Sequence, residues 1–202
     1  MKRRQSARRR DLVRGLSPSR RDRVRPCLES VEERVLPSTL NLLADVRPGA
    51  GLGSGPHSFT PLNGRLYFSA DDGTSGRELW RHDPTTNTTT RVADINPGGG
   101  SSLDNVDQPF TVLNNQLYFV ATDGATGREL WRHDPAANTT TLVADIQSGA
   151  GSPEIDQLIV LNNQLYFSAD DGNGVVGQEL WRHDPATNTT SLVADIRAKA
   201  PG

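Results

Sequence analysis

Short apolar runs separated by turn-forming residues follow one another from about residue 41 to residue 196. In the middle of the chain, Phe110–Leu113 leads through Asn114-Asn115 into a second run, QLYFVA, at residues 116–121. Asparagine tolerates positive φ, so two strand-like runs joined by such a pair predict a tight type I′ hairpin. Asn63-Gly64 and Asn162-Asn163 occupy the equivalent places. The pattern therefore predicts β-strands and almost no helix.

Two further strands follow each hairpin. An acidic, glycine-containing loop leads to the third strand, R-E-L-W-R-H, and an Asp-Pro-x-x-Asn turn leads to a fourth, Thr-rich strand. Proline presets φ in such a turn, asparagine suits a left-handed position, and β-branched residues favour a pleated surface. The turn asparagines are Asn87, Asn138 and Asn188, and the expected fourth strands are Thr89–Asp94, Thr140–Asp145 and Thr190–Asp195.

The octapeptide RELWRHDP occurs at residues 77–84 and 128–135, and QELWRHDP occurs at 178–185. The three tryptophans therefore lie 51 and 50 residues apart, and a period near 50 is typical of β-propeller blades. We predict an all-β fold of three tandem four-stranded antiparallel blades over residues 39–196, as a partial propeller or an open array. The repeats span 58–95, 109–146 and 157–196, an extra strand precedes them at 40–46, and 197–202 forms a tail. Each blade buries its leucine and tryptophan, such as Leu79 and Trp80, on opposite faces.

Three blades are fewer than the four to eight that close a propeller. The alternatives are an open stack, self-association that completes a ring, and a remnant of a longer gene. The abrupt ending after Ile196 favours a truncated array that is stabilised by assembly.

Charge divides the chain into a basic arm and an acidic body. Residues 1–25 carry eleven Lys or Arg and two Asp, whereas the other 177 residues carry eleven basic and twenty-two acidic side chains. The segment 1–38 has no aromatic residue and is expected to be disordered, with a short amphipathic helix at 28–36. Without aromatics for base stacking, the arm does not indicate a nucleic-acid partner. Cys27 is the only cysteine and is interpreted as an incidental thiol.

Residues 28–38, LESVEERVLPS, follow the arginine-rich stretch. They resemble the N-terminal sorting segment of planctomycete surface proteins, roughly a basic run and then L-E-x-L-E-x-R-x-L-x-S. The matching residues are Leu28, Glu29, Glu32, Arg34, Leu36 and Ser38, while Val31 replaces the second leucine. The resemblance implies an extracellular or cell-envelope location. The sequence contains no run of about 18 apolar residues, so it predicts no transmembrane helix.

The repeats resemble the ELWxxDGT repeat family of bacterial surface and secreted proteins. That unit reads approximately L-F-F-x-A-x-D-G-x-x-G-x-E-L-W-x-[ST]-D-G-T, later V-x-D-I-x-P-G. The first repeat matches it at Phe68, Ala70, Asp72, Gly73, Gly76, Glu78, Leu79, Trp80, Asp83, Asp94, Ile95, Pro97 and Gly98. Asp-Pro replaces Asp-Gly-Thr after each tryptophan, which changes the chemistry of that turn. The resemblance implies a propeller-like scaffold at the cell surface and brings no catalytic residues.

Two sets of residues are candidates for binding a metal. His82, His133 and His183 are equivalent in the three repeats, so repetition alone explains them, and we interpret them as structural or solvent-exposed. Asp71, Asp72 and Glu78 surround Gly73 in the first repeat, and calcium prefers such oxygen-rich loops. The second repeat has Thr122 in place of the first aspartate, so the set is not repeated in full.

The functional hypothesis is a non-enzymatic, exported repeat scaffold that contacts proteins or polysaccharides at the cell surface. No catalytic residues are assigned, because each candidate polar residue recurs as part of the repeat and active sites are usually asymmetric. The alternatives are a calcium-stabilised extracellular binding module and a non-functional fragment of a longer repeat protein.

Overall fold

The computed structural model describes residues 41–49, 51–103, 110–174 and 177–196. The basic tail with its expected helix at 28–36, Cys27 and the tail 197–202 lie outside the described residues. Within the described ranges, all regular secondary structure is β-strand, which confirms the all-β prediction. None of the described segments is a helix long and apolar enough to cross a membrane.

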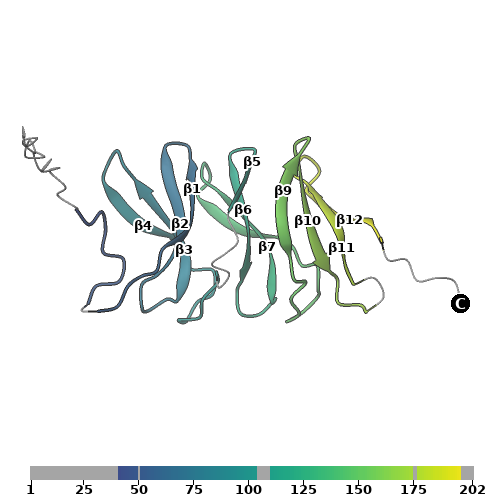
Figure 1. Ribbon diagram of the computed structural model, residues 1–202, viewed down its shortest axis with the longest axis horizontal. Helices are drawn as coiled ribbons and strands as arrows, with labels where there is room; N and C mark the ends of the chain where they lie inside the picture. Colours follow the sequence, from purple (N-terminus) through teal and green to yellow (C-terminus); the bar gives the residue numbers. More distant parts are fainter. Residues whose placement is uncertain (1–40, 50, 104–109, 175–176, 197–202) are drawn as a thin grey trace, which may run out of the picture. The chain divides into compact units, whose positions relative to one another are not determined.

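The strands form three four-stranded antiparallel sheets, one for each repeat, and we call them the first, second and third blades (Figure 1). In every blade the strands pair in chain order. The first blade contains β1 (His57–Leu62), β2 (Arg65–Asp71), β3 (Arg77–Asp83) and β4 (Thr88–Ala93). The second contains β5 (Thr111–Leu113), β6 (Gln116–Thr122), β7 (Arg128–Asp134) and β8 (Thr139–Ala144). The third contains β9 (Asp156–Leu161), β10 (Gln164–Asp170), β11 (Gln178–Asp184) and β12 (Thr189–Ala194).

The turns have the conformations that the sequence predicts. Both residues of the first hairpin turn have positive φ, 51° at Asn63 and 74° at Gly64, as a type I′ turn requires. The paired asparagines of the other two hairpins also have positive φ. Asn87, Asn138 and Asn188 take left-handed conformations with φ between 51° and 53°. The fourth strands begin and end one residue earlier than expected.

Successive side chains along a strand point to opposite faces of the sheet. Apolar residues occur in both alternating sets, so each blade has two apolar faces. On β2 and β3, Phe68 lies opposite Trp80 on one face, while Ser69 lies opposite Leu79 on the other. We call the face that carries the tryptophan the front face and the face that carries the leucine the outer face. The predicted separation of Leu79 and Trp80 is therefore confirmed.

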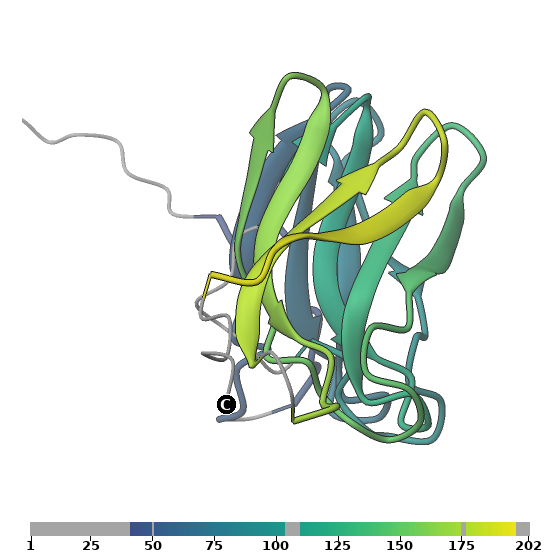
Figure 2. The same ribbon diagram turned by 90° about the vertical axis from the view of Figure 1, so that its right-hand side faces the viewer.

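The core lies between neighbouring blades. One cluster joins the outer face of the first blade, including Tyr67 and Leu79, to the front face of the second, including Phe119 and Trp131. A second cluster repeats this arrangement between the second and third blades. The three blades stand side by side in chain order, as two perpendicular views show (Figures 1 and 2). This succession of sandwiched sheets is β-propeller-like.

The expected extra strand at 40–46 differs from the structure, in which residues 41–46 form no strand. A fourth strand needs the third strand of its own blade as a hydrogen-bonding neighbour, and the described chain contains no such strand before β1. The segment instead borders the front face of the first blade, where Leu43 and Val46 line a cavity together with Leu66 and Phe68. Arg47 anchors its end through an ion pair with Asp71 at 3.0 Å.

Candidate functional site

The three equivalent histidines are buried structural residues. Nδ1 of His82, His133 and His183 lies 2.9–3.0 Å from the hydroxyl oxygen of a threonine on the neighbouring fourth strand: Thr89, Thr140 and Thr190. Each histidine stays within its own blade and on its front face. The histidines therefore do not converge on a common metal site.

Two of these histidines also join one blade to the next. The ring of His133 packs on Tyr67 of the first blade with centroids 5.6 Å apart, and His183 packs on Tyr118 of the second blade at 5.7 Å. Nε2 of both histidines is buried without a hydrogen-bond partner among the described residues. Burial lowers the pKa of His133 to about 4, and the nearby Arg81 charge contributes to this effect. Burial also lowers the pKa of His183.

The glutamate of each ELW motif is a buried acceptor that holds the chain as it leaves the fourth strand. Glu78 accepts hydrogen bonds from the Ile95 amide at 2.9 Å and from the Ser102 hydroxyl at 2.7 Å. Glu129 accepts two amide hydrogen bonds, from Ile146 and Gln147, at 2.9 and 3.0 Å. Burial raises the pKa of Glu78, and it raises the pKa of Glu129 to about 7.

The carboxylates proposed for calcium do not converge in the first blade. Asp72 Oδ1 accepts hydrogen bonds from the amides of Thr74 and Ser75 and from the Thr74 hydroxyl. These hydrogen bonds lower the pKa of Asp72 to about 2, the Ser75 amide contributing most. Asp71 accepts a hydrogen bond from the Gly73 amide and forms an ion pair with Arg47. Glu78 is fully buried and binds Ile95 and Ser102 instead. No group of three or more metal-ligating side chains is found among the described residues.

The aspartate of each Asp-Pro turn binds the turn itself. Oδ1 of Asp83 accepts from the Thr85 amide, and Asp134 and Asp184 do the same with Ala136 and Ala186. The other carboxylate oxygen binds the start of the second strand through Arg65, Gln116 or Gln164. The aspartate of each Asp-Pro turn thus stabilises the turn.

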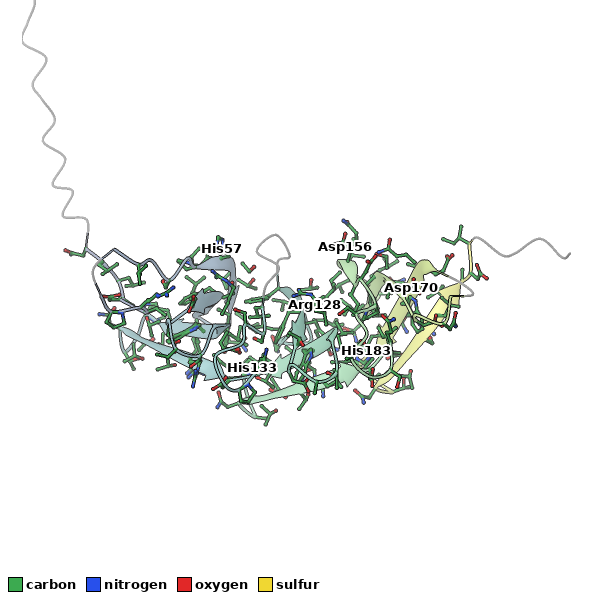
Figure 3. All side chains as sticks on the ribbon, turned by 90° about the horizontal axis from the view of Figure 1, so that it is seen from below. His57, Arg128, His133, Asp156, Asp170 and His183 are labelled. Carbon is green, nitrogen blue, oxygen red and sulfur yellow. The ribbon has the colours of Figure 1, made fainter. Side chains whose placement is uncertain are left out.

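A polar groove lies between the second and third blades. It encloses about 480 Å³ and is lined by Val120, Arg128, Ser152, Glu154, Ile155, Asp156 and Gln178. Figure 3 shows Arg128 and Asp156 near one another on the same side of the blades, away from His133. Cationic, anionic and amide side chains together suit a ligand with many hydroxyl or amide groups. The repeat pattern gives no signal for these residues, because Ser152, Glu154 and Ile155 lie between the repeated strands.

A smaller and more apolar cavity lies on the front face of the first blade. It encloses about 230 Å³ between residues 42–46 and the side chains of Phe59, Leu66, Phe68 and His82. In the second and third blades, the ring of the preceding blade's tyrosine packs on the histidine at the equivalent place.

Comparisons with known proteins identify the fold alone. No protein-family model matches the chain. No curated protein matches it either. Among solved structures, the chain is similar to the S511A mutant of puromycin hydrolase complexed with PGG, with a TM-score of 0.53 and 18% identity over 73% of this chain and 21% of that chain. It is also similar to a puromycin-hydrolyzing peptidase of Mycobacterium tuberculosis, with a TM-score of 0.50 and 14% identity over the same shares.

The chain therefore spans about a fifth of the length of these peptidases. The neighbours are β-propeller-like proteins, which agrees with the three sandwiched sheets. Their sequence identity is too low to carry an activity to this chain.

Proposed function

We propose that the chain is a non-enzymatic, exported repeat scaffold that contacts proteins or polysaccharides at the cell surface. One observation carries the proposal: the repeated polar residues that chemistry would use are engaged in holding the blades together. The glutamates of the ELW motifs bind backbone amides, the histidines bind threonines, and the aspartates of the Asp-Pro turns bind turn amides. The resemblance of the repeats to the ELWxxDGT family supports the same function.

The groove between the second and third blades is the contact surface we propose for a partner. Its lining combines the Arg128 guanidinium, the carboxylates of Glu154 and Asp156, and the Gln178 amide, whose nitrogen donates to the Glu154 carbonyl at 3.1 Å. Such a surface recognises a chain of sugar hydroxyls or a polypeptide backbone through several hydrogen bonds rather than through one deep pocket. The puromycin-hydrolysing activity of the structural neighbours belongs to those proteins and is not transferred.

Export is the first part of the proposal to test. The full chain with a C-terminal tag is produced in the organism that encodes it, and the tag is located by cell fractionation and by its accessibility to an added protease. We expect the tag at the envelope or outside the cell, and in the cytoplasm after deletion of residues 1–38. A full-length chain that stays in the cytoplasm contradicts export.

Surface contact is tested by co-sedimentation of the purified full chain with insoluble cell-wall polysaccharide from the same organism. The variants Asp156→Ala and Gln178→Ala alter the groove, and Thr86→Ala, on an exposed turn of the first blade, is the matched control. We expect groove variants to weaken binding at least threefold while the control binds like the wild type. Equal binding by all four proteins places the contact surface elsewhere.

A further inference from the structure

The outer face of the third blade repeats a surface that is buried twice elsewhere in this chain. Five positions carry the same residue types in every blade: Leu62, Tyr67, Leu79, Val92 and Ile95; Leu113, Tyr118, Leu130, Val143 and Ile146; Leu161, Tyr166, Leu180, Val193 and Ile196. The next blade covers this face in the first two blades, leaving Leu62 and Leu113 only 7% and 4% exposed. In the third blade, Leu161 is 56% and Ile196 is 78% exposed.

The front face of the first blade repeats the opposite half of the same contact. Its residues Leu66, Phe68, Ala70, Trp80 and His82 have identical counterparts in the second and third blades. Those counterparts pack on the preceding blade, where Tyr67 lies against His133 and Tyr118 against His183. Beside His82, the chain instead leaves the 230 Å³ cavity.

We propose that two copies of this chain dock head to tail, the outer face of the third blade of one copy covering the front face of the first blade of the other. Tyr166 of one copy then enters the cavity beside His82 of the other. The occupant follows from continuity with the two internal blade contacts, since both end faces carry the residues that those contacts already pair. This inference goes beyond the scaffold function and does not depend on it.

Head-to-tail docking of this kind closes into a ring when the rotation between copies allows it. Two copies supply six blades, a number within the four to eight that closed propellers contain. In such a ring each copy uses both end faces, so no apolar blade face remains open to water.

Docking also requires residues 42–46 to move. Leu43, Ala44 and Val46 border the front face of the first blade, as Val92, Ala93 and Ile95 border that of the second. In the docked pair, Val193, Ala194 and Ile196 of the other copy take this place. Residues 42–46 therefore compete with the other copy for the front face of the first blade. In this position Leu42 and Leu43 remain largely exposed.

The test measures the mass of the full chain by sedimentation velocity from about 1 to 100 μM, a range that detects micromolar affinities. We expect a species of twice the 21.9 kDa chain mass. Leu161→Arg on the outer face should yield monomer, and so should Phe59→Arg at the exposed edge of the front-face cavity. Leu52→Arg is the matched control, because Leu52 is 62% exposed and belongs to neither face. Circular dichroism verifies that each variant is folded.

Mixing the two monomeric variants distinguishes this arrangement from a symmetric contact between two third blades. Head-to-tail docking leaves one intact contact in the mixture, so Leu161→Arg and Phe59→Arg chains should form a mixed dimer. Leu43→Glu should displace residues 42–46 from the front face, so this variant should dimerise more tightly than the wild type. The proposal is overturned if the wild type is monomeric, if it forms larger open polymers, or if either arginine variant still dimerises like the wild type. None of these outcomes bears on export or polysaccharide binding.

Discussion

The imidazole ring of His133 lies on the phenol ring of Tyr67, which belongs to the preceding blade, with their centroids 5.6 Å apart. The histidine side chain reaches this position from the third strand while Nδ1 contacts the Thr140 hydroxyl at 3.0 Å. Protonation would create a buried charge with N–H donors on both ring nitrogens, and the described residues offer no acceptor at Nε2. The contact between blades therefore favours the neutral imidazole.

Replacement of His133 by phenylalanine should remove a pH-dependent part of the stability while keeping a ring against Tyr67. The pKa of His133 falls from 6.5 to about 4 on folding, so its contribution is complete above pH 6.5 and is lost as the pH falls toward 4. In urea unfolding, the free energy of unfolding of the wild type should fall by up to about 3 kcal/mol relative to that of His133→Phe as the pH decreases from 6.5 toward 4. His183→Phe is the internal comparison and should show a change of the same sign. Parallel pH profiles for wild type and variant would contradict the effect of burial.

Glu129 should affect stability in the opposite direction. Its pKa rises from 4.5 to about 7 on folding, so the folded state favours the protonated carboxyl. The free energy of unfolding therefore falls as the pH rises from about 4.5 to 7, and it changes no further above that range. Glu129→Gln removes this titration. The stability of the variant minus that of the wild type should increase between pH 4.5 and 7 in urea melts.

Glu78 provides the comparison for this prediction. Both glutamates accept amide hydrogen bonds, but Glu78 also accepts one from the Ser102 hydroxyl, and Pro153 takes the equivalent place in the second blade. The hydroxyl stabilises the ionised carboxylate, so Ser102→Ala should raise the pKa of Glu78 further. The ¹³C chemical shift of the Glu78 carboxyl, followed against pH, measures the change. An unchanged titration would show that the hydroxyl does not stabilise the charge.

Asp72 should stabilise the first acidic loop without calcium. Its carboxylate accepts three hydrogen bonds from Thr74 and Ser75, which hold its pKa near 2 instead of 3.8. Its contribution is present above pH 3.8 and is lost as the pH falls toward 2. Asp72→Ala should lower stability at pH 7 by about 1–2 kcal/mol, as loss of a capping side chain does. Thermal melts of the wild type should be equal in EDTA and in millimolar calcium, and a calcium-dependent rise would restore the metal hypothesis.

The sequence predicts the fold well because the signals for it are local and repeated. Asn-Gly and Asn-Asn pairs determine the hairpins, and the alternation around Leu79 and Trp80 indicates two buried faces. The expected strand at 40–46 is wrong over its described residues because its letters match a fourth strand while its pairing partner is missing. Likewise, the spacing of the histidines is visible in the sequence, but their contact with tyrosines about 65 residues earlier depends on how blades pack.

The polar groove could not be found from repetition because its lining combines the connector between two repeats with strand residues of two blades. Glu154 lies in that connector and Asp156 begins β9, whereas Arg128 and Gln178 begin the third strands of two different blades. Only the packing of the second blade on the third brings these side chains together. The calcium hypothesis was weakened for a related reason, since adjacent carboxylates in sequence bind different partners once the loop folds.

The glycine before each third strand provides a direct test of how tightly the connectors pack. Gly127 and Gly177 have nearly equal φ, 71° and 72°, so alanine is equally strained by its backbone at both positions. An added Cβ at Gly127 would collide with the Gly151 carbonyl, whereas at Gly177 it would meet no described atom within 4 Å. Gly177→Ala should cost about 1–2 kcal/mol for the left-handed conformation alone.

Gly127→Ala should cost that amount plus about 1–3 kcal/mol, since the backbone of the connector must move away from the new methyl group. Urea unfolding of the two variants measures the difference, and Gly76→Ala should behave like Gly127→Ala, because its added Cβ would meet the backbone of Gly100 and Ser101 at 2.6–2.7 Å. Equal losses at Gly127 and Gly177 would mean that the connector yields freely, so that the blades are held by their apolar faces and the buried glutamates alone. A larger loss at Gly127 shows that the connector is held firmly against the start of β7 and cannot move away from the added methyl group.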